Sequence, residues 1–366
     1  MFLQRAICVL CESSLSPFFS LQKFPLNSHP THLSADTDVF CDYEYGICTL
    51  CKCVQLTTLV DPSFLYSSDN KHGLTPLWNE HHRQFSDFIK SHAKSNSICE
   101  IGGGSNNLSS FLFSHFKNYT VLDLYQPELQ EKYIHYITAN CESFSDYAED
   151  TLVLSHTFEH LYSPRKFLEA ISKSNVKHVF VSVPNMKLWL EKHISSFIVF
   201  NQHTFYFEKE DVLALFSQYG FRCKNSTLFA DHSLFFCFER DSNTKALDIP
   251  IKQNTTRLFS HFHNKLQLKH TLLTQKDVFI MPSFYIGQIA HFFLNHHNIR
   301  GFLDNDRNKA NKRLYGTPLT TYLPEKVKEH SPESITIFLV KTPYYDEMYE
   351  QLKYLQPSVE IIPIEV

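Results

Sequence analysis

The feature that most constrains the fold is a short apolar strand that runs directly into a glycine-rich loop, in the segment SICEIGGGSNNL at residues 97–108. The strand carries an acid, Glu100, near its end, and the glycines from Gly102 to Gly104 permit tight backbone geometry. Residues 108–116 then have the apolar spacing of a helix. In parallel sheets the ligand lies outside the carboxyl ends of the strands, where a bare glycine loop exposes backbone N–H groups. We therefore expect a cofactor site at this loop.

A second acidic residue, Asp123, strengthens this interpretation. Residues 119–124 have the pattern of a second strand, and Asp123 stands where such folds place a carboxylate that accepts the ribose hydroxyls of a cofactor. The dinucleotide fingerprint requires a third glycine where Asn107 stands, and the Gly-Lys-Ser/Thr of a phosphate loop is missing here. The pattern thus disfavours NAD and ATP. The alternative to a cofactor site is an ordinary strand-to-helix turn.

Length and charge narrow the class of function. The chain has 366 residues, 43% of them hydrophobic, and chains of this size form about two to three globular domains. The net charge is −4 and Lys and Arg form no run, so nucleic acid and membrane surfaces are not expected partners. The apolar patch at the N-terminus is too short for a signal peptide, and no stretch has the length of a membrane span. We expect a cytoplasmic protein that acts on a small molecule.

Two Cys-x-x-Cys pairs indicate a structural zinc site. The pairs are Cys8 with Cys11 and Cys48 with Cys51. Each short loop turns two sulfurs toward one point, and four thiolates close the tetrahedral coordination that zinc prefers. The intervening segment is longer than a usual zinc-ribbon gap, so Cys41 or Cys53 could replace one of these ligands. Incidental buried cysteines are the alternative, because disulfides are rare in the cytosol.

The middle of the chain alternates strand and helix patterns. A helix is predicted over residues 77–93, and its His81-His82 pair is expected on the solvated surface. Further strands are predicted at 133–137, 150–155 and 176–183, and further helices at 163–172 and 209–219, with Gly220 as a cap after the last. This alternation predicts a doubly wound α/β sheet.

Polar residues that follow the predicted strands are candidates for the same edge of the sheet. Asn140 follows the third strand, where a polar group could meet an adenine edge, and Ser155 and His156 end the fourth. His160 completes the segment HTFEH, which lies at the mouth of the sheet. His203 lies in the aromatic loop FNQHTFYF at residues 200–207, where substrate-facing residues of such sheets usually occur. A buried core histidine is the alternative for this residue.

A second, smaller α/β domain is predicted at the C-terminal end. The composition turns polar at residues 241–245, and a helix is expected over 254–272. Strands at 278–281, 299–303 and 334–340 alternate with helices at 285–294 and 344–355. The predicted domains are therefore a zinc-binding module with a linker at 1–70, a cofactor-binding domain at 71–244, and the C-terminal α/β domain at 245–366.

The glycine loop and the later acid, Glu100-x-Gly-x-Gly104 followed by Asp123, resemble the class I S-adenosylmethionine (SAM)-dependent methyltransferases. Across nearly the whole chain, the order of motifs resembles a narrower family. It is similar to the three-domain sugar C-methyltransferases, which have an N-terminal zinc-binding module and act on nucleotide-linked 4-keto-6-deoxy sugars. The segments that carry this likeness are residues 48–56 (CTLCKCVQL), Trp78–His81, the glycine loop, residues 201–207 (NQHTFYF), residues 301–306 (GFLDND) and residues 312–318 (KRLYGTP).

The resemblance implies roles for particular residues, and the chain departs from the family at one of them. The family shows Tyr-His-Glu-His in the aromatic loop with the last His as general base, whereas this chain has Phe200, Asn201, Gln202 and His203. His203 is thus the implied base. The missing Tyr hydroxyl and Glu carboxylate would otherwise help to polarise a ketone or orient the base. Tyr206 or His160 could steady the enolate oxygen instead.

The expected function is therefore SAM-dependent C-methylation of a nucleotide-linked keto-deoxy sugar. The sulfonium of SAM activates the methyl group, so the protein mainly aligns it with the nucleophile. O- or N-methylation of a sugar or another small molecule is the alternative among enzymes, and a non-catalytic SAM-binding scaffold is the alternative outside them. The residues expected to bind the cofactor are Glu100, Gly102, Gly104, Asp123, Leu124, Asn140, Ser155 and His156.

Overall fold

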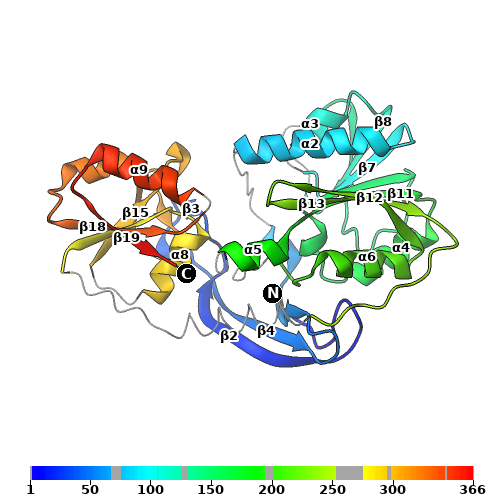
Figure 1. Cartoon of the computed structure of the whole chain (residues 1–366), viewed down its shortest axis with the longest axis horizontal. Coiled ribbons are helices and arrows are strands. Elements are labelled where there is room, and N and C mark those ends of the chain that lie inside the picture. Colours follow the sequence, from blue (N-terminus) through cyan, green and yellow to red (C-terminus); the bar gives the residue numbers. More distant parts are fainter. Residues whose placement is uncertain are drawn as a thin grey trace. The chain divides into compact units, whose positions relative to one another are not determined.

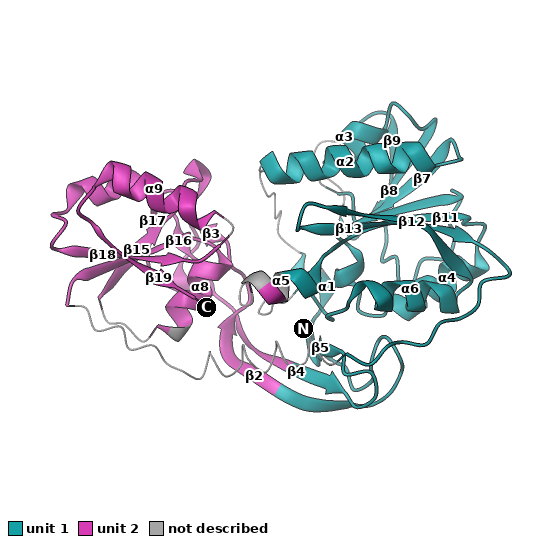
Figure 2. Cartoon of the chain, in the orientation of Figure 1, with its two compact units in different colours: residues 1–18, 45–189, 202–253 teal, residues 19–44, 190–201, 254–366 magenta. Residues whose placement is uncertain are grey.

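The computed structural model describes residues 2–66, 76–104, 106–125, 130–193, 202–252, 275–294, 298–342 and 344–365. The chain divides into two compact units, shown in Figure 2. The first unit comprises residues 1–18, 45–189 and 202–253, and the second comprises residues 19–44, 190–201 and 254–366. The first unit thus joins both Cys-x-x-Cys segments to the sheet that carries the glycine loop. The predicted division into three domains stays a prediction.

The first unit is built on a seven-stranded sheet with the order β12-β13-β11-β10-β7-β8-β9 (Figure 1). Neighbouring strands from β11 to β9 are parallel, whereas β13 runs antiparallel to both β11 and β12. This mostly parallel sheet is typical of class I methyltransferases and confirms the α/β prediction. The strands are β7 (Ser97–Ile101), β8 (Asn118–Asp123), β9 (Ile134–Thr138), β10 (Thr151–Ser155), β11 (His178–Pro184), β12 (Phe221–Phe229) and β13 (Ser233–Arg240).

The central strands form because they are apolar runs that become buried on both faces. Every residue of β11 is buried, as are the first four residues of β10. Continuous apolar runs of this kind are typical of parallel strands covered by helices on both sides. The hairpin of β12 and β13 was not anticipated from the sequence, although the inward residues of β13 are phenylalanines that pack on β11.

The helices predicted at 77–93, 163–172 and 209–219 are confirmed within about one residue, whereas α1 (Pro62–Leu65) and α5 (Met186–His193) were not predicted. The predicted helix at 108–116 shrinks to α3 (Ser109–Leu112), after which the chain turns into β8. The predicted cap is confirmed, since Gly220 follows α6 at φ +79°. The helix α4 begins with a proline in its first turn, where its missing N–H costs no hydrogen bond. The other helices are α1 (Pro62–Leu65), α2 (Pro76–His92), α4 (Pro164–Lys173), α5 (Met186–His193), α6 (Lys209–Gln218) and the short 3₁₀ turn η2 (Phe158–His160).

The expectation that His81 and His82 lie on the surface is wrong. His81 is fully buried and His82 is 8% exposed. His81 precedes Phe85 by four residues and Phe85 precedes Ile89 by four, so helical geometry places all three on the face of α2 that packs on the sheet. The spacing of His81 relative to the apolar residues of α2 therefore determines its burial, although histidine is a polar residue.

The N-terminal part of the chain is largely extended. It consists of β1 (Phe2–Gln4), β2 (Leu15–Pro25), β3 (Pro30–Thr31), the 3₁₀ turn η1 (Ala35–Thr37), β4 (Phe40–Cys48), β5 (Val54–Leu56) and β6 (Thr58–Val60). β1 pairs antiparallel with β6, and β2, β4 and β5 form a three-stranded sheet. After the second cysteine pair, the chain thus forms two short strands, β5 and β6, that pair with different partners. The long β2 and β4 had no sequence signal strong enough to predict them.

The second unit contains a five-stranded parallel sheet with the order β17-β15-β14-β18-β19. Alternate residues of β14 face opposite sides: Val278 and Ile280 belong to one apolar core, and Phe279 and Met281 to the other. Its elements are β14 (Asp277–Met281), α8 (Tyr285–Phe293), β15 (Ile299–Leu303), η3 (Arg307–Lys309), β16 (Arg313–Leu314), β17 (Thr321–Tyr322), η4 (Pro324–Glu329), β18 (Ile335–Val340), α9 (Tyr345–Leu355) and β19 (Glu360–Ile364).

The strands and helices predicted for this unit are confirmed, except that the expected helix at 254–272 lies outside the described residues. The segment 19–44 is held to the unit by a buried ion pair. Both guanidinium nitrogens of Arg313 donate to the Asp38 carboxylate, at 2.7 Å each, and β16 pairs with β3. Among the residues that the structure describes, no helix is long and apolar enough to cross a membrane.

Candidate active site and cysteine cluster

The glycine loop after β7 adopts a conformation that requires glycine. Gly102 has φ +77°, and its N–H donates to the carbonyl of Leu122 at 2.8 Å. A Cβ at this position would lie 2.6 Å from the hydroxyl oxygen of Thr157, which itself donates to the carbonyl of Ile101. The strained φ and the close contact both exclude a side chain, so the loop stays open at the carboxyl edge of the sheet.

The carboxylate of Asp123, at the end of β8, is hydrogen-bonded to the same loop. Its Oδ2 accepts a hydrogen bond from the Gly104 N–H at 2.8 Å, and its Oδ1 accepts one from the Tyr125 N–H at 3.2 Å. A Cβ at Gly104 would lie 2.9 Å from Oδ2, so glycine permits this close approach. The carboxylate is only half-buried, and burial raises its pKa. It therefore remains within reach of a ligand at the sheet edge.

Glu100 lies beneath the glycine loop. It is 3% exposed, and the Tyr119 hydroxyl donates to its Oε2 at 2.6 Å. A Cβ at Gly103 would lie 2.5 Å from its carboxyl carbon. Burial raises the pKa of Glu100 to about 7, so its charge changes close to neutral pH.

The remaining residues predicted to bind the cofactor also lie at this edge. Leu124 follows Asp123 and is half-buried. The Ala139 N–H donates to the Asp123 carbonyl, so the loop after β9 begins next to Asp123. The Asn140 Oδ1 accepts from the Glu142 N–H at 2.9 Å, so a local turn orients this side chain. The Ser155 hydroxyl has no hydrogen-bond partner among the residues that the structure describes.

His156 points into an aromatic cluster beside α2. It adopts φ +51°, its Nε2 lies 2.8 Å from the Ser233 hydroxyl, and its Nδ1 lies 3.1 Å from Glu159 Oε1. We call the group formed by Trp78, His81, His82, His156 and His232 the histidine cluster. The rings of His81, His156 and His232 meet Trp78 edge to face, and the His82 ring stacks on it. Burial lowers the pKa of each histidine, to about 4 for His82 and His232.

Next to this cluster, the 3₁₀ turn η2 brings Glu159 and His160 to His203. Ligand-type atoms of the three side chains all lie within 4.8 Å of one another. The ring centroids of His160 and His203 are 5.3 Å apart, and the Tyr66 hydroxyl lies 3.1 Å from His160 Nδ1. Glu159 is fully buried and His203 is 7% exposed. Burial lowers the pKa of both histidines and raises that of Glu159 to about 7.

The loop that carries His203 is held by the N-terminal strands. The Leu56 N–H donates to the Thr204 carbonyl at 3.0 Å, and the Tyr206 N–H donates to the Val54 carbonyl at 2.9 Å. Arg5 also donates to the Thr204 carbonyl, at 2.7 Å. The loop therefore extends the edge of β5 as an irregular strand.

This extended pairing separates two residues that were predicted to act together. His203 and Tyr206 differ by an odd number of positions, so extended backbone points them to opposite sides. The Tyr206 ring is 2% exposed and lies 6.3 Å from the Tyr45 ring, centroid to centroid. The structure thus brings His160 to His203, whereas Tyr206 packs toward the N-terminal strands.

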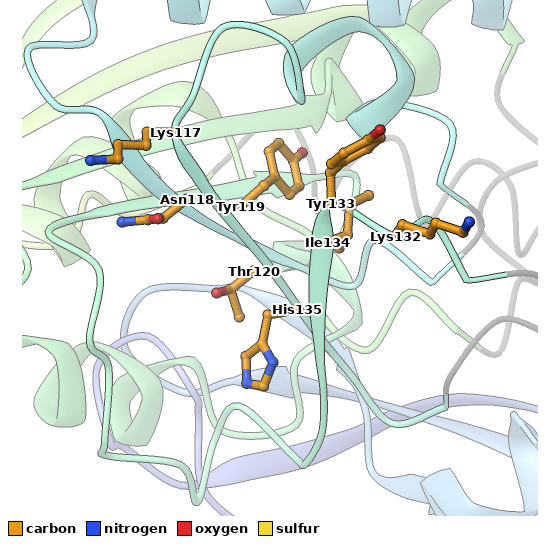
Figure 3. A pocket seen from close by; sticks show the side chains of 8 residues that line it. All are labelled: Lys117, Asn118, Tyr119, Thr120, Lys132, Tyr133, Ile134 and His135. Atoms are coloured by element: carbon orange, nitrogen blue, oxygen red, sulfur yellow. The ribbon is translucent and has the colours of Figure 1, made fainter.

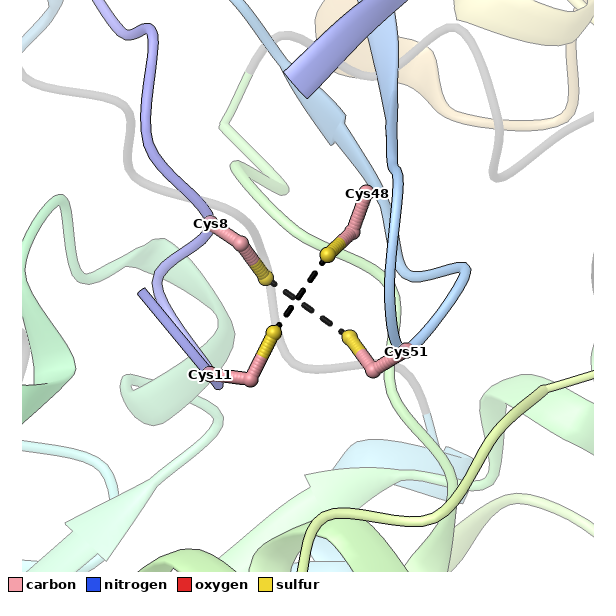
Figure 4. Close-up of side chains that lie close together, drawn as sticks. All are labelled: Cys8, Cys11, Cys48 and Cys51. Carbon is pink, nitrogen blue, oxygen red and sulfur yellow. Dashed lines mark hydrogen bonds between the residues drawn. The ribbon is translucent and has the colours of Figure 1, made fainter. Parts of the chain in front are cut away.

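The four cysteines of the two Cys-x-x-Cys pairs converge on one point (Figure 4). The Sγ atoms of Cys8 and Cys51 are 3.7 Å apart, and those of Cys11 and Cys48 are 3.3 Å apart. Zinc–sulfur bonds of about 2.3 Å in a tetrahedron require sulfurs about 3.8 Å apart, so the donor set fits a zinc ion.

Buried neighbours connect the cysteine cluster to the strands and to α6. The Gln55 side chain of β5 donates to the Cys8 sulfur at 3.1 Å, and the Val9 N–H donates to the Gln55 Oε1. Lys252 pairs with Asp211 of α6 at 2.6 Å, with both side chains almost inaccessible, and its N–H donates to the Cys51 carbonyl. A buried ammonium beside the cysteines favours the negative charge of a thiolate site.

A pocket of about 350 Å³ lies elsewhere on this unit (Figure 3). Its walls include Asn118 and Ile134, the first residues of β8 and β9. It therefore opens at the amino edge of the sheet, away from the loops described above. Ligands of open α/β sheets bind at the carboxyl edge, so this pocket is not the candidate active site. The lining residues are Lys117, Asn118, Tyr119, Thr120, Lys132, Tyr133, Ile134 and His135.

Residues 74–225 match a sequence family described as a methyltransferase domain. No curated protein matches the chain. Among solved structures, the N-methyltransferase NodS from Bradyrhizobium japonicum, with bound S-adenosyl-L-homocysteine, is 18% identical with a TM-score of 0.36, covering 45% of this chain and 88% of its own. Magnesium protoporphyrin IX methyltransferase from Synechocystis is 10% identical with a TM-score of 0.38, covering 47% and 90%.

A putative methyltransferase from Haloferax volcanii, solved with a methyltransferase activator, is 12% identical with a TM-score of 0.37, covering 44% of this chain and 92% of its own. At these TM-scores the likenesses add no argument about substrate or partner. The class follows from the strand order, the glycine loop with its two acids, and the family match: the first unit contains a class I methyltransferase domain. The chain is a SAM-dependent methyltransferase, and residues 74–225 carry its methyltransferase domain.

Two parts of the site were missed in the sequence. Glu159 was passed over although it stands between the two histidines of the HTFEH segment, and the burial of His81 could have been found from its helical spacing to Phe85. No sequence signal predicted that His232, far along the chain, would join His156.

Proposed function

We propose that this methyltransferase methylates a carbon atom of a nucleotide-linked keto-deoxy sugar, with His203 as general base. The observation that carries the proposal is the place of His203, a buried imidazole beside His160 in a loop at the mouth of the sheet. Burial holds its pKa well below the usual value, so the imidazole is neutral at pH 7 and its lone pair can accept a proton. The choice of a nucleotide sugar rests on the motif resemblance.

SAM would lie over the glycine loop. Asp123 would accept the ribose hydroxyls, Leu124 and Asn140 would face the adenine, and Glu100 would support the loop from below, with Ser155 and His156 lining the methyl-transfer edge. When bound, SAM supplies an activated methyl group on its sulfonium. The residues of the chain hold the acceptor in line with this methyl and exclude water.

For carbon methylation, the base must remove the proton next to the ketone. The C–H bond breaks, its electron pair remains on the enolate, and the proton moves to His203. The enolate carbon then forms a bond to the methyl group as the bond from that methyl to the sulfonium breaks, with the electron pair of the broken bond left on the now neutral sulfur. The imidazolium returns its proton to water. His160, near His203, would steady the enolate oxygen. Tyr206 is the less suitable candidate for that task because its ring packs toward Tyr45.

The test is incubation of the protein with methyl-labelled SAM and a panel of nucleotide 4-keto sugars, followed by NMR location of the label. Label on carbon supports the proposal. Label on oxygen or nitrogen would favour the alternative acceptor chemistry, and SAM binding without transfer to any sugar would favour a scaffold. His203→Ala should bind SAM normally and lose roughly 10²- to 10⁴-fold in turnover, the usual worth of a positioned base. His135→Ala, on an exposed strand position, is the matched control.

The four-cysteine cluster is proposed as a structural zinc site with Cys8, Cys11, Cys48 and Cys51 as ligands. Support comes from the sulfur separations of 3.3 and 3.7 Å. Elemental analysis should find one zinc per chain. Cys48→Ser should lose this zinc and unfold at lower temperature, whereas Cys223→Ser, a half-buried cysteine outside the cluster, should do neither. Full zinc content in Cys48→Ser would exclude the assignment.

A further inference from the structure

Glu159 is a fully buried carboxylate at the candidate active site. Its Oε1 lies 3.1 Å from His156 Nδ1, and neither carboxylate oxygen has a well-directed hydrogen bond among the residues that the structure describes. Removal of a carboxylate from water costs several kcal/mol unless hydrogen bonds or an opposite charge compensate. A buried acid with so few partners therefore requires an explanation other than packing.

The groups around Glu159 are imidazoles rather than permanent cations. His156 contacts it from the same turn, and atoms of His160 and His203 lie within 4.8 Å. The Tyr66 hydroxyl contacts one of these imidazoles, since it lies 3.1 Å from His160 Nδ1. Arg5, which follows β1, donates its guanidinium hydrogens to carbonyl oxygens, including that of Thr204 at 2.7 Å. Within this set, the positive charge that Glu159 can compensate is an imidazolium.

The backbone ties the acid to the proposed base. The Thr204 N–H, next to His203, donates to the Glu159 carbonyl at 3.0 Å. His156 is itself fixed on its other side, because its Nε2 lies 2.8 Å from the Ser233 hydroxyl. The backbone of Glu159 is therefore tied to the loop that carries His203, and its carboxylate is tied to β13 through His156.

We propose that Glu159 is the positioning residue of His203. Its carboxylate orients the His203 imidazole and stabilises the imidazolium that forms when His203 takes the substrate proton. This inference rests on the proposed role of His203 as base. Protons and electrons balance as in the reaction above, because Glu159, which is mostly ionised above its pKa of about 7, neither gains nor loses a proton in the step. An opposite charge a few ångströms away in a buried site favours the charged form of the imidazole, which lowers the barrier to proton removal.

The first experiment needs no substrate. Full-length zinc-loaded protein is labelled with ¹⁵N-histidine, and His203→Gln assigns the His203 signals. In the wild type at pH 7.5, the neutral His203 ring should be in one tautomer. Glu159→Gln, an isosteric change without charge, should give the other tautomer or a mixture, whereas Glu159→Asp should retain the wild-type tautomer. Glu149→Gln removes another buried acid of this unit, one paired with Thr120, and should leave His203 unchanged.

The second experiment measures the reaction. Where a keto sugar is a substrate, Glu159→Gln should lower kcat for deuterium exchange from D₂O by roughly 10- to 100-fold with KM nearly unchanged, and Glu159→Asp should recover part of the loss. Loss of the imidazolium partner should also move the acid limb of the pH–rate profile to lower pH, which a merely structural role would not do. Thermal unfolding of each variant shows that the measured protein is folded.

Two results would overturn the inference. One is an unchanged His203 tautomer in folded Glu159→Gln. The other is stoichiometric binding of added Zn²⁺ to the zinc-loaded wild type, by calorimetry, that disappears in Glu159→Gln, because Glu159, His160 and His203 would then form a metal site. If the wild type acts on no sugar of the panel, the proposed substrate fails while the tautomer measurement still decides the role of Glu159.

Discussion

At the scale of single residues, the glycine loop after β7 depends on contacts that tolerate no added atoms. Gly104 and Asp123 are joined by a hydrogen bond of 2.8 Å, and a Cβ on the glycine would lie 2.9 Å from the carboxylate. The acid therefore has two tasks, because it shapes the loop and remains half-exposed for a ligand.

Asp123→Ala should weaken SAM binding by about 1–3 kcal/mol, the cost of losing a charged hydrogen bond, measured by calorimetry. The N–H groups of Gly104 and Tyr125, which donate hydrogen bonds to the Asp123 carboxylate, would also lose their acceptor. Asp146→Ala, an exposed acid of the same domain, is the control and should bind normally. Equal affinity in Asp123→Ala would show that the ribose is held by other residues.

Gly102→Ala and Gly220→Ala separate two effects of a side chain. Both glycines have a positive φ, +77° and +79°, but a Cβ would meet Thr157 only at Gly102 and would meet nothing within 4 Å at Gly220. Gly220→Ala should cost about 1 kcal/mol of stability from backbone strain alone, and Gly102→Ala should cost more and abolish SAM binding. Urea unfolding and calorimetry measure the two effects, and equal destabilisation would contradict the contact with Thr157.

At the scale of elements, the cysteine cluster is connected to α6 and to the active-site loop. Gln55 of β5 contacts Cys8, and the neighbours of Gln55 in β5 pair with the loop that carries His203. On the other side, Lys252 and Asp211 form a buried ion pair next to the cluster. Zinc binding is thus expected to organise β5 and, through it, the proposed base.

Lys252→Met should destabilise the protein by about 3–5 kcal/mol, because it leaves the Asp211 carboxylate buried without its cation. Burial raises the pKa of Asp211 to about 6 even with the lysine present. The double variant Lys252→Met with Asp211→Leu should regain much of the loss in denaturant unfolding. A single variant as stable as the wild type would mean that this pair contributes nothing.

At the scale of the whole molecule, buried histidines make stability depend on pH. The pKa is lowered by burial for His81, His82, His156, His160, His203 and His232, and raised to about 7 for the buried acids Glu100 and Glu159. The histidines bind protons more readily in the unfolded chain, so they favour unfolding below pH 6.5. These acids, together with Asp123 and Asp211, whose pKa burial also raises, act in the opposite direction, but the six histidines outnumber them.

The free energy of unfolding should therefore fall as the pH drops from 6.5 to 5.5, the range in which the unfolded histidines take up protons. His82 and His232, with pKa values of about 4 in the folded state, each contribute at most about 1.4 kcal/mol per pH unit below 6.5. Urea unfolding at several pH values measures the slope. The variant with both His82→Gln and His232→Gln should show a shallower slope, and an unchanged slope would place the pH dependence in other groups.

The elements with the strongest patterns were predictable from the sequence. These patterns are local: the strand into the glycine loop, the second acid Asp123, and the apolar runs of β10 and β11. A buried strand requires consecutive apolar residues and a tight loop requires glycine, so each element can be recognised from residues that are adjacent in sequence. The cysteine pairs were predictable for the same reason, since each Cys-x-x-Cys is a short loop. The proximity of the two pairs follows from β4, β5 and the first strands, and it appears only in the folded chain.

The sequence by itself therefore determined the α/β class, the glycine loop, its two acids and the four cysteines. Only the tertiary structure decided which polar residues meet at the candidate active site. Glu159 meets His203 across 44 positions of sequence, and His156 meets Ser233 across 77, because separate loops converge at one edge of the sheet. His81 became a core residue and Tyr206 was directed away from His203 by the same cause, since packing and strand pairing choose the face on which a side chain lies.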